Sequence, residues 1–173
     1  RYVDLGLSVK WATVNIGSPL QEGAGDYYAW GVTTTGDKLG GEYSEKSYSV
    51  DVGIAGDIGG SQYDVARTVW GGSWRLPTKD EFEELKNKCK WEWTVKEYFS
   101  GYKITGPSGN SIYLPAGGYR NGYSKHEVGR RGEYWTSTPF DDKNAYSLTF
   151  DGEMSYVSCF PKYVGRNIRP VTE

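Results

Sequence analysis

The sequence contains only two cysteines, Cys89 and Cys159, and a single histidine. Two cysteines so far apart exclude a small protein stapled by several disulfides, although they could pair with each other or both stay reduced. No stretch approaches the ~20 consecutive apolar residues of a transmembrane helix, so we expect no direct membrane insertion. Neither charge predominates, because 20 Lys and Arg face 22 Asp and Glu. We therefore expect no nucleic-acid partner, since a phosphate backbone is bound by a broad positive field.

Aromatic residues and glycine are abundant instead. The 173 residues include 7 Trp, 15 Tyr and 24 Gly, and aromatic residues make up 16% of the chain. This composition is neither that of a disordered protein nor that of a helix bundle. The length suits a domain with a core of its own, so we expect residues 1–173 to form one domain.

The first part of the chain favours short strands, a long loop and one helix. Apolar residues alternate over residues 5–13, which is the period of a half-buried strand, and residues 27–31 predict a second strand. The run between residues 33 and 60 is rich in Gly, Ser, Thr and Asp and is expected to be a long surface loop. A helix with Ser61 as its N-cap is then expected over residues 62–70.

A second helix is better defined by its sequence. Thr78 and Glu81 have the spacing of a capping box, in which each side chain accepts a backbone N–H group near the helix start. We expect this helix over residues 79–89. Its apolar face consists of Phe82, Leu85 and Cys89.

The remainder of the chain is rich in predicted strands. Residues 102–105 and 111–114 flank a Gly-Pro-Ser-Gly-Asn turn and predict a hairpin. A Gly-rich loop is expected over residues 116–132. Further strands are expected at residues 134–137, 146–150, 155–160 and 167–171. Strands segregated from two helices in this way indicate an α+β fold.

Few side chains could support catalysis or bind a metal. His126 lies in a polar loop, without the carboxylate and nucleophile of a catalytic relay beside it, so we expect a solvated residue. Cys89 is expected to be a small core residue. Several acidic residues could offer oxygen ligands to calcium, but they lack a spaced calcium loop and are expected to be solvated turn carboxylates. These residues are Asp141, Asp142, Asp151 and Glu153.

Two basic clusters occur in the second half of the chain. At this net charge, such clusters more often mark local anion contacts or cross-strand pairs than a nucleic-acid groove. The first consists of Lys125, Arg130 and Arg131, and the second of Lys162, Arg166 and Arg169.

Several motifs resemble known domains. The run Trp74-Arg75-Leu76-Pro77-Thr78-Lys79-Asp80-Glu81-Phe82 resembles a helix opening in formylglycine-generating-enzyme-like domains, a branch of the C-type lectin fold. The closing Arg166-Asn167-Ile168-Arg169-Pro170-Val171 fits the same branch. Nearly the whole chain resembles the Fibrobacter succinogenes major paralogous domain, common in surface and secreted proteins of gut Bacteroidetes. The motifs that carry this second resemblance lie at residues 2–13, 25–31, 70–78, 109–116, 118–122 and 134–137.

The resemblance implies a C-type lectin-like fold, with two helices packed on a twisted, mainly antiparallel sheet with long loops. It also implies an extracellular or cell-surface location, with residues 1–173 as the C-terminal module of a larger exported protein. Relatives often carry a cysteine where this chain has Val14, which implies that Cys89 is unpaired unless it meets Cys159. Enzymes of the wider fold hold copper with two nearby cysteines, a motif that this chain does not match. We therefore expect no catalysis, no metal and no other cofactor, because fold alone never implies activity.

The segment from Tyr134 to Val171 also resembles the variable region of proteins diversified by diversity-generating retroelements. Such proteins display changeable side chains on a rigid C-type lectin-like scaffold. In the strand at residues 146–150, the even-numbered residues share one face, and Ser147 and Thr149 share the other. One face can therefore anchor the strand while the other is free to contact a ligand.

The pairing of this strand with the next is left open by the sequence. A three-residue turn would pair Phe150 with Met154, whereas a four-residue turn would pair it with Ser155. Aromatic, basic and amide groups suited to contact surfaces occur throughout this part of the chain. The candidate ligand-binding residues are Trp135, Ser147, Thr149, Asp151, Tyr156, Ser158, Phe160, Lys162, Tyr163 and Asn167.

Three functions are compatible with these observations. The first is a non-catalytic extracellular module that binds a protein or glycan ligand through the surface at about residues 134–167. Calcium-dependent lectins of this fold carry Glu-Pro-Asn or Gln-Pro-Asp and Trp-Asn-Asp motifs, which the sequence lacks, so calcium-independent binding is expected. The second is a structural or adhesive domain of a surface or fimbrial assembly. The third, an enzyme of the formylglycine-generating type, would need paired thiols and copper.

Overall fold

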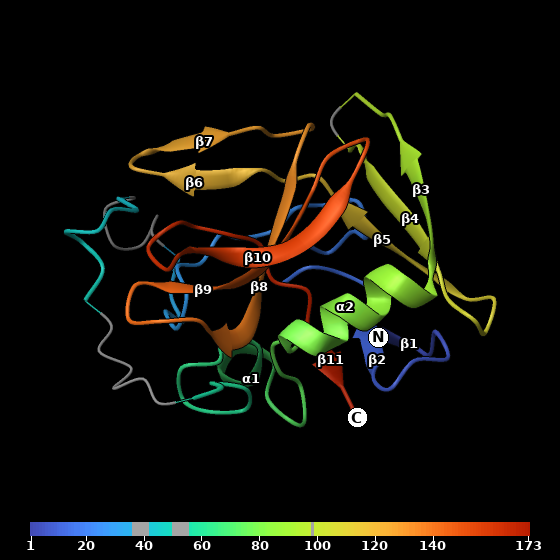
Figure 1. Ribbon diagram of the computed structural model, residues 1–173, viewed down its shortest axis with the longest axis horizontal. Helices are drawn as coiled ribbons and strands as arrows, with labels where there is room; N and C mark the ends of the chain where they lie inside the picture. The colour runs from blue at the N-terminus through green and yellow to red at the C-terminus, as the bar shows by residue number, and fades with distance from the viewer. Residues whose placement is uncertain (36–41, 50–55, 98) are drawn as a thin grey trace.

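A computed structural model describes residues 1–35, 42–49, 56–97 and 99–173. Parts of the loop expected between residues 33 and 60 therefore lie outside the described residues. The described chain is a mixed α and β structure with mainly antiparallel strands and two helices. Figure 1 shows both helices in the lower half of the view, where the two termini also lie. None of the described helices is long and apolar enough to cross a membrane.

Four small sheets make up the β structure of the described residues, and every pair of strands within them is antiparallel. The first contains β1 (Tyr2–Val3), β2 (Lys10–Ala12) and β11 (Val171–Thr172), and the second contains β8 (Gly132–Pro139), β9 (Asn144–Phe150) and β10 (Ser155–Pro161). The third contains β3 (Lys90–Thr94), β4 (Gly101–Thr105) and β5 (Ser111–Pro115), and the fourth contains β6 (Tyr119–Asn121) and β7 (Ser124–His126). The predicted hairpin of β4 and β5 is confirmed.

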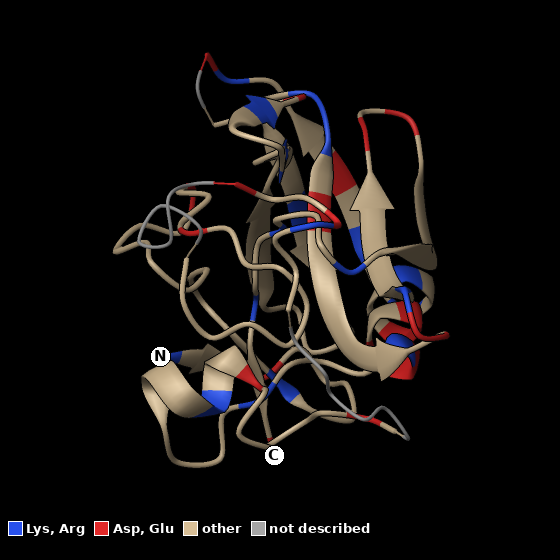
Figure 2. Ribbon diagram, turned by 90° about the vertical axis from the view of Figure 1, so that its left-hand side faces the viewer, with Lys and Arg blue, Asp and Glu red and all other residues tan. Residues whose placement is uncertain are grey.

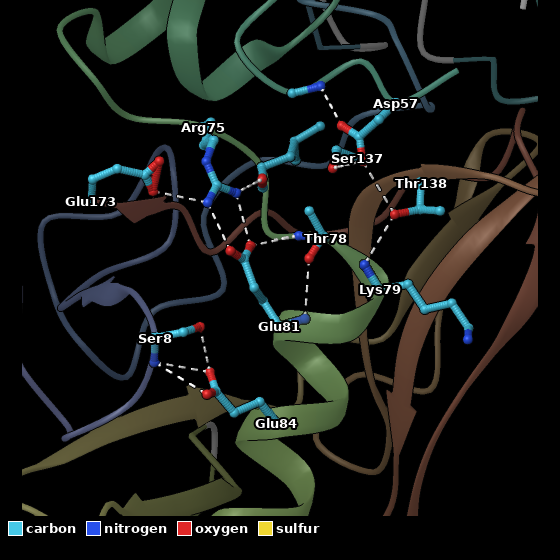
Figure 3. Close-up of polar contacts among 12 residues, drawn as sticks. Ser8, Asp57, Arg75, Thr78, Lys79, Glu81, Glu84, Ser137, Thr138 and Glu173 are labelled. Atoms are coloured by element: carbon cyan, nitrogen blue, oxygen red, sulfur yellow. Dashed lines mark hydrogen bonds and ion pairs between the residues drawn. The ribbon is translucent and has the colours of Figure 1, made fainter. Parts of the chain in front are cut away.

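The second predicted helix is confirmed as α2 (Lys79–Lys88), and its capping box is complete. The Thr78 hydroxyl accepts the Glu81 N–H at 3.1 Å, and the Glu81 carboxylate accepts the Thr78 N–H at 2.8 Å, as Figure 3 shows. Phe82 and Leu85 are fully buried against the core. Cys89 lies just beyond the helix as its C-cap and packs on the same cluster.

The first helix, α1 (Val65–Trp70), is shorter than predicted, and its N-cap is Asp64 rather than Ser61. The Ser61 hydroxyl accepts the Tyr63 N–H and so stabilises the turn before the helix. The buried Asp64 carboxylate accepts four backbone N–H groups instead. These belong to Ala66 and Arg67 within the helix, to Gly60, and to Leu76 far along the chain.

The early strands are shorter than the alternation of apolar residues predicts. Leu5, Val9 and Trp11 are buried as expected, but Gly6 has a φ of +82° and its N–H bonds to Asp4, so a turn interrupts the predicted strand. The prediction for residues 27–31 is wrong, because this segment makes only an isolated bridge through Tyr28.

Some strands were missed or misplaced. β3 was not predicted, and the hairpin of β6 and β7 occupies the segment expected to be a Gly-rich loop. The predicted closing strand at residues 167–171 is reduced to β11 and single bridges. Strands this short depend on tertiary pairing, which local sequence patterns do not encode.

The polar contacts at the start of α2 give a pH-dependent contribution to stability. Arg75 donates to both Glu81 carboxylate oxygens, at 2.8 and 2.7 Å, and also contacts Glu173 (Figure 3). Burial alone would raise the pKa of Glu81, but the hydrogen bonds from Arg75 and from the Thr78 N–H hold this pKa below its usual value. Because the folded-state pKa is lowered, the contribution is present above the unfolded pKa and is lost as the pH falls through the folded pKa.

We expect Glu81→Gln to lower the free energy of unfolding by about 1–2 kcal/mol at neutral pH, because the charge of the Arg75 partner is lost. The difference should shrink towards pH 3, because the wild type loses this stabilisation as the pH falls below the unfolded pKa of Glu81. Urea unfolding at both pH values measures it. The exposed Glu153→Gln is the control and should show no such trend. An equal effect of Glu81→Gln at both pH values would contradict the assignment.

Candidate functional site

The register of β8, β9 and β10 places six of the ten candidate residues on one face. Phe150 pairs with Ser155, so the four-residue turn is the correct alternative. Ser147 pairs with Trp135 on one side and Ser158 on the other, and Thr149 pairs with Glu133 and Tyr156. We call this surface the Ser147 face. It consists of Glu133, Trp135, Ala145, Ser147, Thr149, Tyr156, Ser158 and Phe160.

The middle of the Ser147 face is not available to a ligand. Ser147 and Thr149 are 0% and 1% exposed, and Trp135 is equally buried. The expectation that this side of the strand is free is therefore wrong for these three residues. The physical reason is the guanidinium of Arg166, which lies 4.8 Å from the Trp135 ring centre and donates to the Ser147 hydroxyl at 3.2 Å. Only the β10 edge of the face, at Tyr156, Ser158 and Phe160, is partly or fully exposed.

Arg166 is held by a buried ion pair. It is 3% exposed and pairs with the Glu133 carboxylate, which is 2% exposed and also contacts Arg131 at 3.0 Å. The Phe160 ring lies on the guanidinium as well, with 4.5 Å between them. Burial lowers the pKa of Arg166 to about 10, which leaves it charged at neutral pH. Arg166 therefore fills the Ser147 face as a structural group.

Asn167 and Asp151, two further candidates, have structural contacts. Asn167 is fully buried, its side-chain amide donates to the Asp26 carbonyl, and its backbone bonds to β8. The Asp151 carboxylate accepts the N–H groups of Glu153 and Met154 and closes the turn between β9 and β10. These bonds hold the pKa of Asp151 below its usual value. The interpretation of Asp151 as a turn carboxylate is confirmed.

The last two candidates, Lys162 and Tyr163, line a cavity of about 440 Å³. The cavity lies where β9 begins and β10 ends, and the Lys162 N–H bonds to the Lys143 carbonyl across these ends at 2.9 Å. We call it the Lys162 pocket. Its lining residues are Glu45, Tyr48, Asp142, Lys143, Asn144, Pro161, Lys162 and Tyr163.

The pocket offers groups of several kinds. The Lys162 side chain is only 1% exposed, lies on the Trp30 ring at 4.7 Å and donates to the Asp142 carbonyl at 3.1 Å. Burial lowers the pKa of the Lys162 ammonium group. Lys143 and Glu45 form an exposed ion pair at 3.4 Å that joins the two sides of the pocket. Aromatic rings, an amide and charges of both signs thus surround one hollow, which suits a polar ligand with an apolar face.

Sequence reasoning missed one wall of this pocket. Glu45 and Tyr48 come from a segment that was expected to be an unpatterned loop, and the Tyr48 hydroxyl donates to the Trp30 carbonyl. No motif or periodicity in the segment indicates this contact. A second hollow of about 560 Å³ lies elsewhere, and its lining includes Trp70 and Trp74.

The second basic cluster does not form an exposed patch, whereas Lys125 and Arg130 of the first cluster are exposed. Lys162, Arg166 and Arg169 are all buried. On the side drawn in Figure 2, basic and acidic segments are interspersed rather than gathered.

The potentially reactive side chains are dispersed in the described part of the chain. His126 is exposed and stacks on Tyr119, with 5.3 Å between ring centres. Cys89 and Cys159 are both free, which settles their pairing. Burial raises the pKa of the Cys89 thiol to about 11, so it is protonated at neutral pH and a weak nucleophile. No group of three or more His, Cys, Asp or Glu in the described residues could hold a metal ion.

Comparison with known proteins connects the sheet and pocket to one family. Residues 79–171 match the model of a domain of unknown function, DUF8237. The matched segment runs from α2 to the start of β11 and covers more than half of the chain. The chain belongs to the DUF8237 family. Within this family segment lie the whole Ser147 face and six of the eight residues that line the Lys162 pocket. No curated protein and no solved structure matches the chain.

Proposed function

We propose that this DUF8237 protein is a non-catalytic, exported module that binds a saccharide in the Lys162 pocket, on a C-type lectin-like scaffold. The observation that carries the proposal is the lining of the pocket. The rings of Tyr48 and Tyr163 offer apolar surfaces on which a sugar face can stack, and Lys143, Asp142 and Asn144 offer hydrogen bonds to hydroxyl groups.

The proposal includes binding without calcium. One carboxylate near the pocket is engaged in a turn, because Asp141 Oδ1 accepts the N–H groups of Lys143 and Asn144 and a hydrogen bond from the Asn144 side-chain amide. These bonds hold the pKa of Asp141 below its usual value. A carboxylate oxygen that accepts three hydrogen bonds is a poor free ligand for a cation.

A broad glycan array, probed once with calcium and once with a chelator, tests the proposal. We expect binding to one class of saccharide that is equal in both conditions. Binding only with calcium would contradict the role given to the turn carboxylates. Absence of binding in both conditions would overturn the saccharide proposal and favour a protein ligand or a subunit role in a surface assembly.

Tyr163→Ala should weaken binding of the saccharide found on the array by about tenfold, because the stacking surface is lost. The Tyr163 side chain makes no hydrogen bond among the described residues, so its removal strands no buried partner. Isothermal titration measures the change. The matched control is Tyr2→Ala, another partly exposed tyrosine, which lies on β1 in a different sheet and should leave the affinity unchanged. Equal effects of the two variants would place the site elsewhere.

A further inference from the structure

Strand β10 forms an open edge of its sheet. It is the outer strand in the order β10–β9–β8, and Figure 1 shows it passing in front of β8. All of its residues, Ser155–Pro161, are at least partly exposed. The strand contains no charged residue, and its only proline is the last residue. Natural edge strands are usually blocked by charges, prolines or bulges, so a seven-residue edge without them is a template for another strand.

The backbone of β10 has hydrogen-bonding groups directed outward. The Asp151 N–H bonds to the Met154 carbonyl at the turn, and the Lys162 N–H bonds to the Lys143 carbonyl at the other end. Hydrogen-bonded and non-hydrogen-bonded pairs alternate along an antiparallel ladder. The backbone N–H and C=O groups of the even-numbered residues of β10 therefore bond to β9, and those of the odd-numbered residues point away from it. The outward N–H groups of Val157 and Cys159 have no partner among the residues that the structure describes.

The outer strand β3 of another sheet differs in this respect. It carries Lys90 and Glu92, both exposed, which discourage pairing with another strand. On β10, in contrast, residues at equal distances before and after Ser158 in the sequence match each other in chemical type. Tyr156 and Phe160 are aromatic, and Val157 and Cys159 are small and apolar.

We propose that β10 pairs with β10 of a second copy of this chain, antiparallel and centred on Ser158. This register places Tyr156 opposite Phe160 of the second copy and Val157 opposite Cys159 of the second copy. Aromatic cross-strand pairs of this kind stabilise a sheet. The outward N–H groups of Val157 and Cys159 gain carbonyl partners, and the two three-stranded sheets become one continuous sheet.

The pairing has a consequence for the geometry of the pair. A rise of about 3.4 Å per residue puts Pro161 of one copy about 20 Å from Pro161 of the other. The two Lys162 pockets, which begin at this residue, would then lie near opposite ends of the paired strands. The pairing itself does not depend on what the pocket binds, so the two proposals can fail separately.

Two single-cysteine substitutions, each made with Cys159→Ala, test the register. Ser158→Cys should form a disulfide-linked dimer under mild oxidation, because the central residues of a two-fold, non-hydrogen-bonded pair lie about 4.5 Å apart at Cα. Ser155→Cys, also on β10, should form no disulfide-linked dimer, because its counterpart in the second copy lies about 20 Å away in this register. Equal crosslinking of the two variants would overturn the proposal.

Sedimentation velocity of the unmodified chain tests the pairing without cysteines. We expect a monomer–dimer equilibrium that shifts with concentration, and loss of the dimer in Tyr156→Lys, which sets a charge against Phe160. Tyr156 is exposed, so circular dichroism should show that this variant remains folded. A monomer at all concentrations, or a dimer that Tyr156→Lys leaves intact, would overturn the proposal.

Discussion

Replacing Glu133 by alanine should lower the free energy of unfolding by about 3–5 kcal/mol, because it leaves a buried charge on Arg166 without its partner. Both side chains are at most 3% exposed, so water cannot take the place of the carboxylate. The guanidinium would remain between the rings of Trp135 and Phe160 with one hydrogen bond to the Ser147 hydroxyl. Urea unfolding at neutral pH measures the loss.

A double variant separates the ion pair from simple packing. Glu133→Leu combined with Arg166→Met removes both charges and keeps much of the volume, so it should be less destabilised than Glu133→Ala alone. A small effect of Glu133→Ala would mean that Arg166 can leave the Ser147 face and reach solvent. The middle of that face would then be accessible, and the assignment of Arg166 as a structural group would be wrong.

Asp64→Ala should cost about 3 kcal/mol of stability, the second largest effect that we expect from a single substitution. The carboxylate caps α1 and also accepts the N–H groups of Gly60 and Leu76, so its removal leaves buried donors without acceptors. Thermal unfolding followed by circular dichroism measures the change.

Ser61→Ala is the matched control, since Ser61 was the N-cap predicted from the sequence. Its hydroxyl accepts only the Tyr63 N–H, in a partly exposed turn. We expect a change of less than about 1 kcal/mol. A larger loss for Ser61→Ala than for Asp64→Ala would contradict the cap assigned by the structure.

Local signals account for the elements that the sequence predicted well. The Thr78 and Glu81 capping box lies within four residues, and the spacing of Phe82 and Leu85 follows the helix period, so α2 could be placed almost to the residue. The hairpin of β4 and β5 likewise contains its own turn. The sequence narrowed the register of β9 and β10 to two alternatives. In the alternative that the structure shows, the Asp151 carboxylate accepts backbone N–H groups of the turn.

Contacts between distant residues explain what the sequence could not show. The alternation over β9 correctly divided its two faces, but nothing near Ser147 indicates that Arg166 and Glu133 would cover it. The same holds for Tyr48, which reaches the Lys162 pocket from a segment without periodicity. Short strands such as β6 and β7 form because partners are brought together in the fold, and their own residues carry a weak strand signal.

The most direct test of the proposed binding site is a nuclear magnetic resonance titration of the isotope-labelled chain with the best saccharide from the array. We predict chemical-shift changes concentrated at residues 142–144 and 161–163, with the Tyr163 ring protons among those that change most. Changes concentrated at Trp70 and Trp74, which line the second hollow, would contradict saccharide binding in the Lys162 pocket.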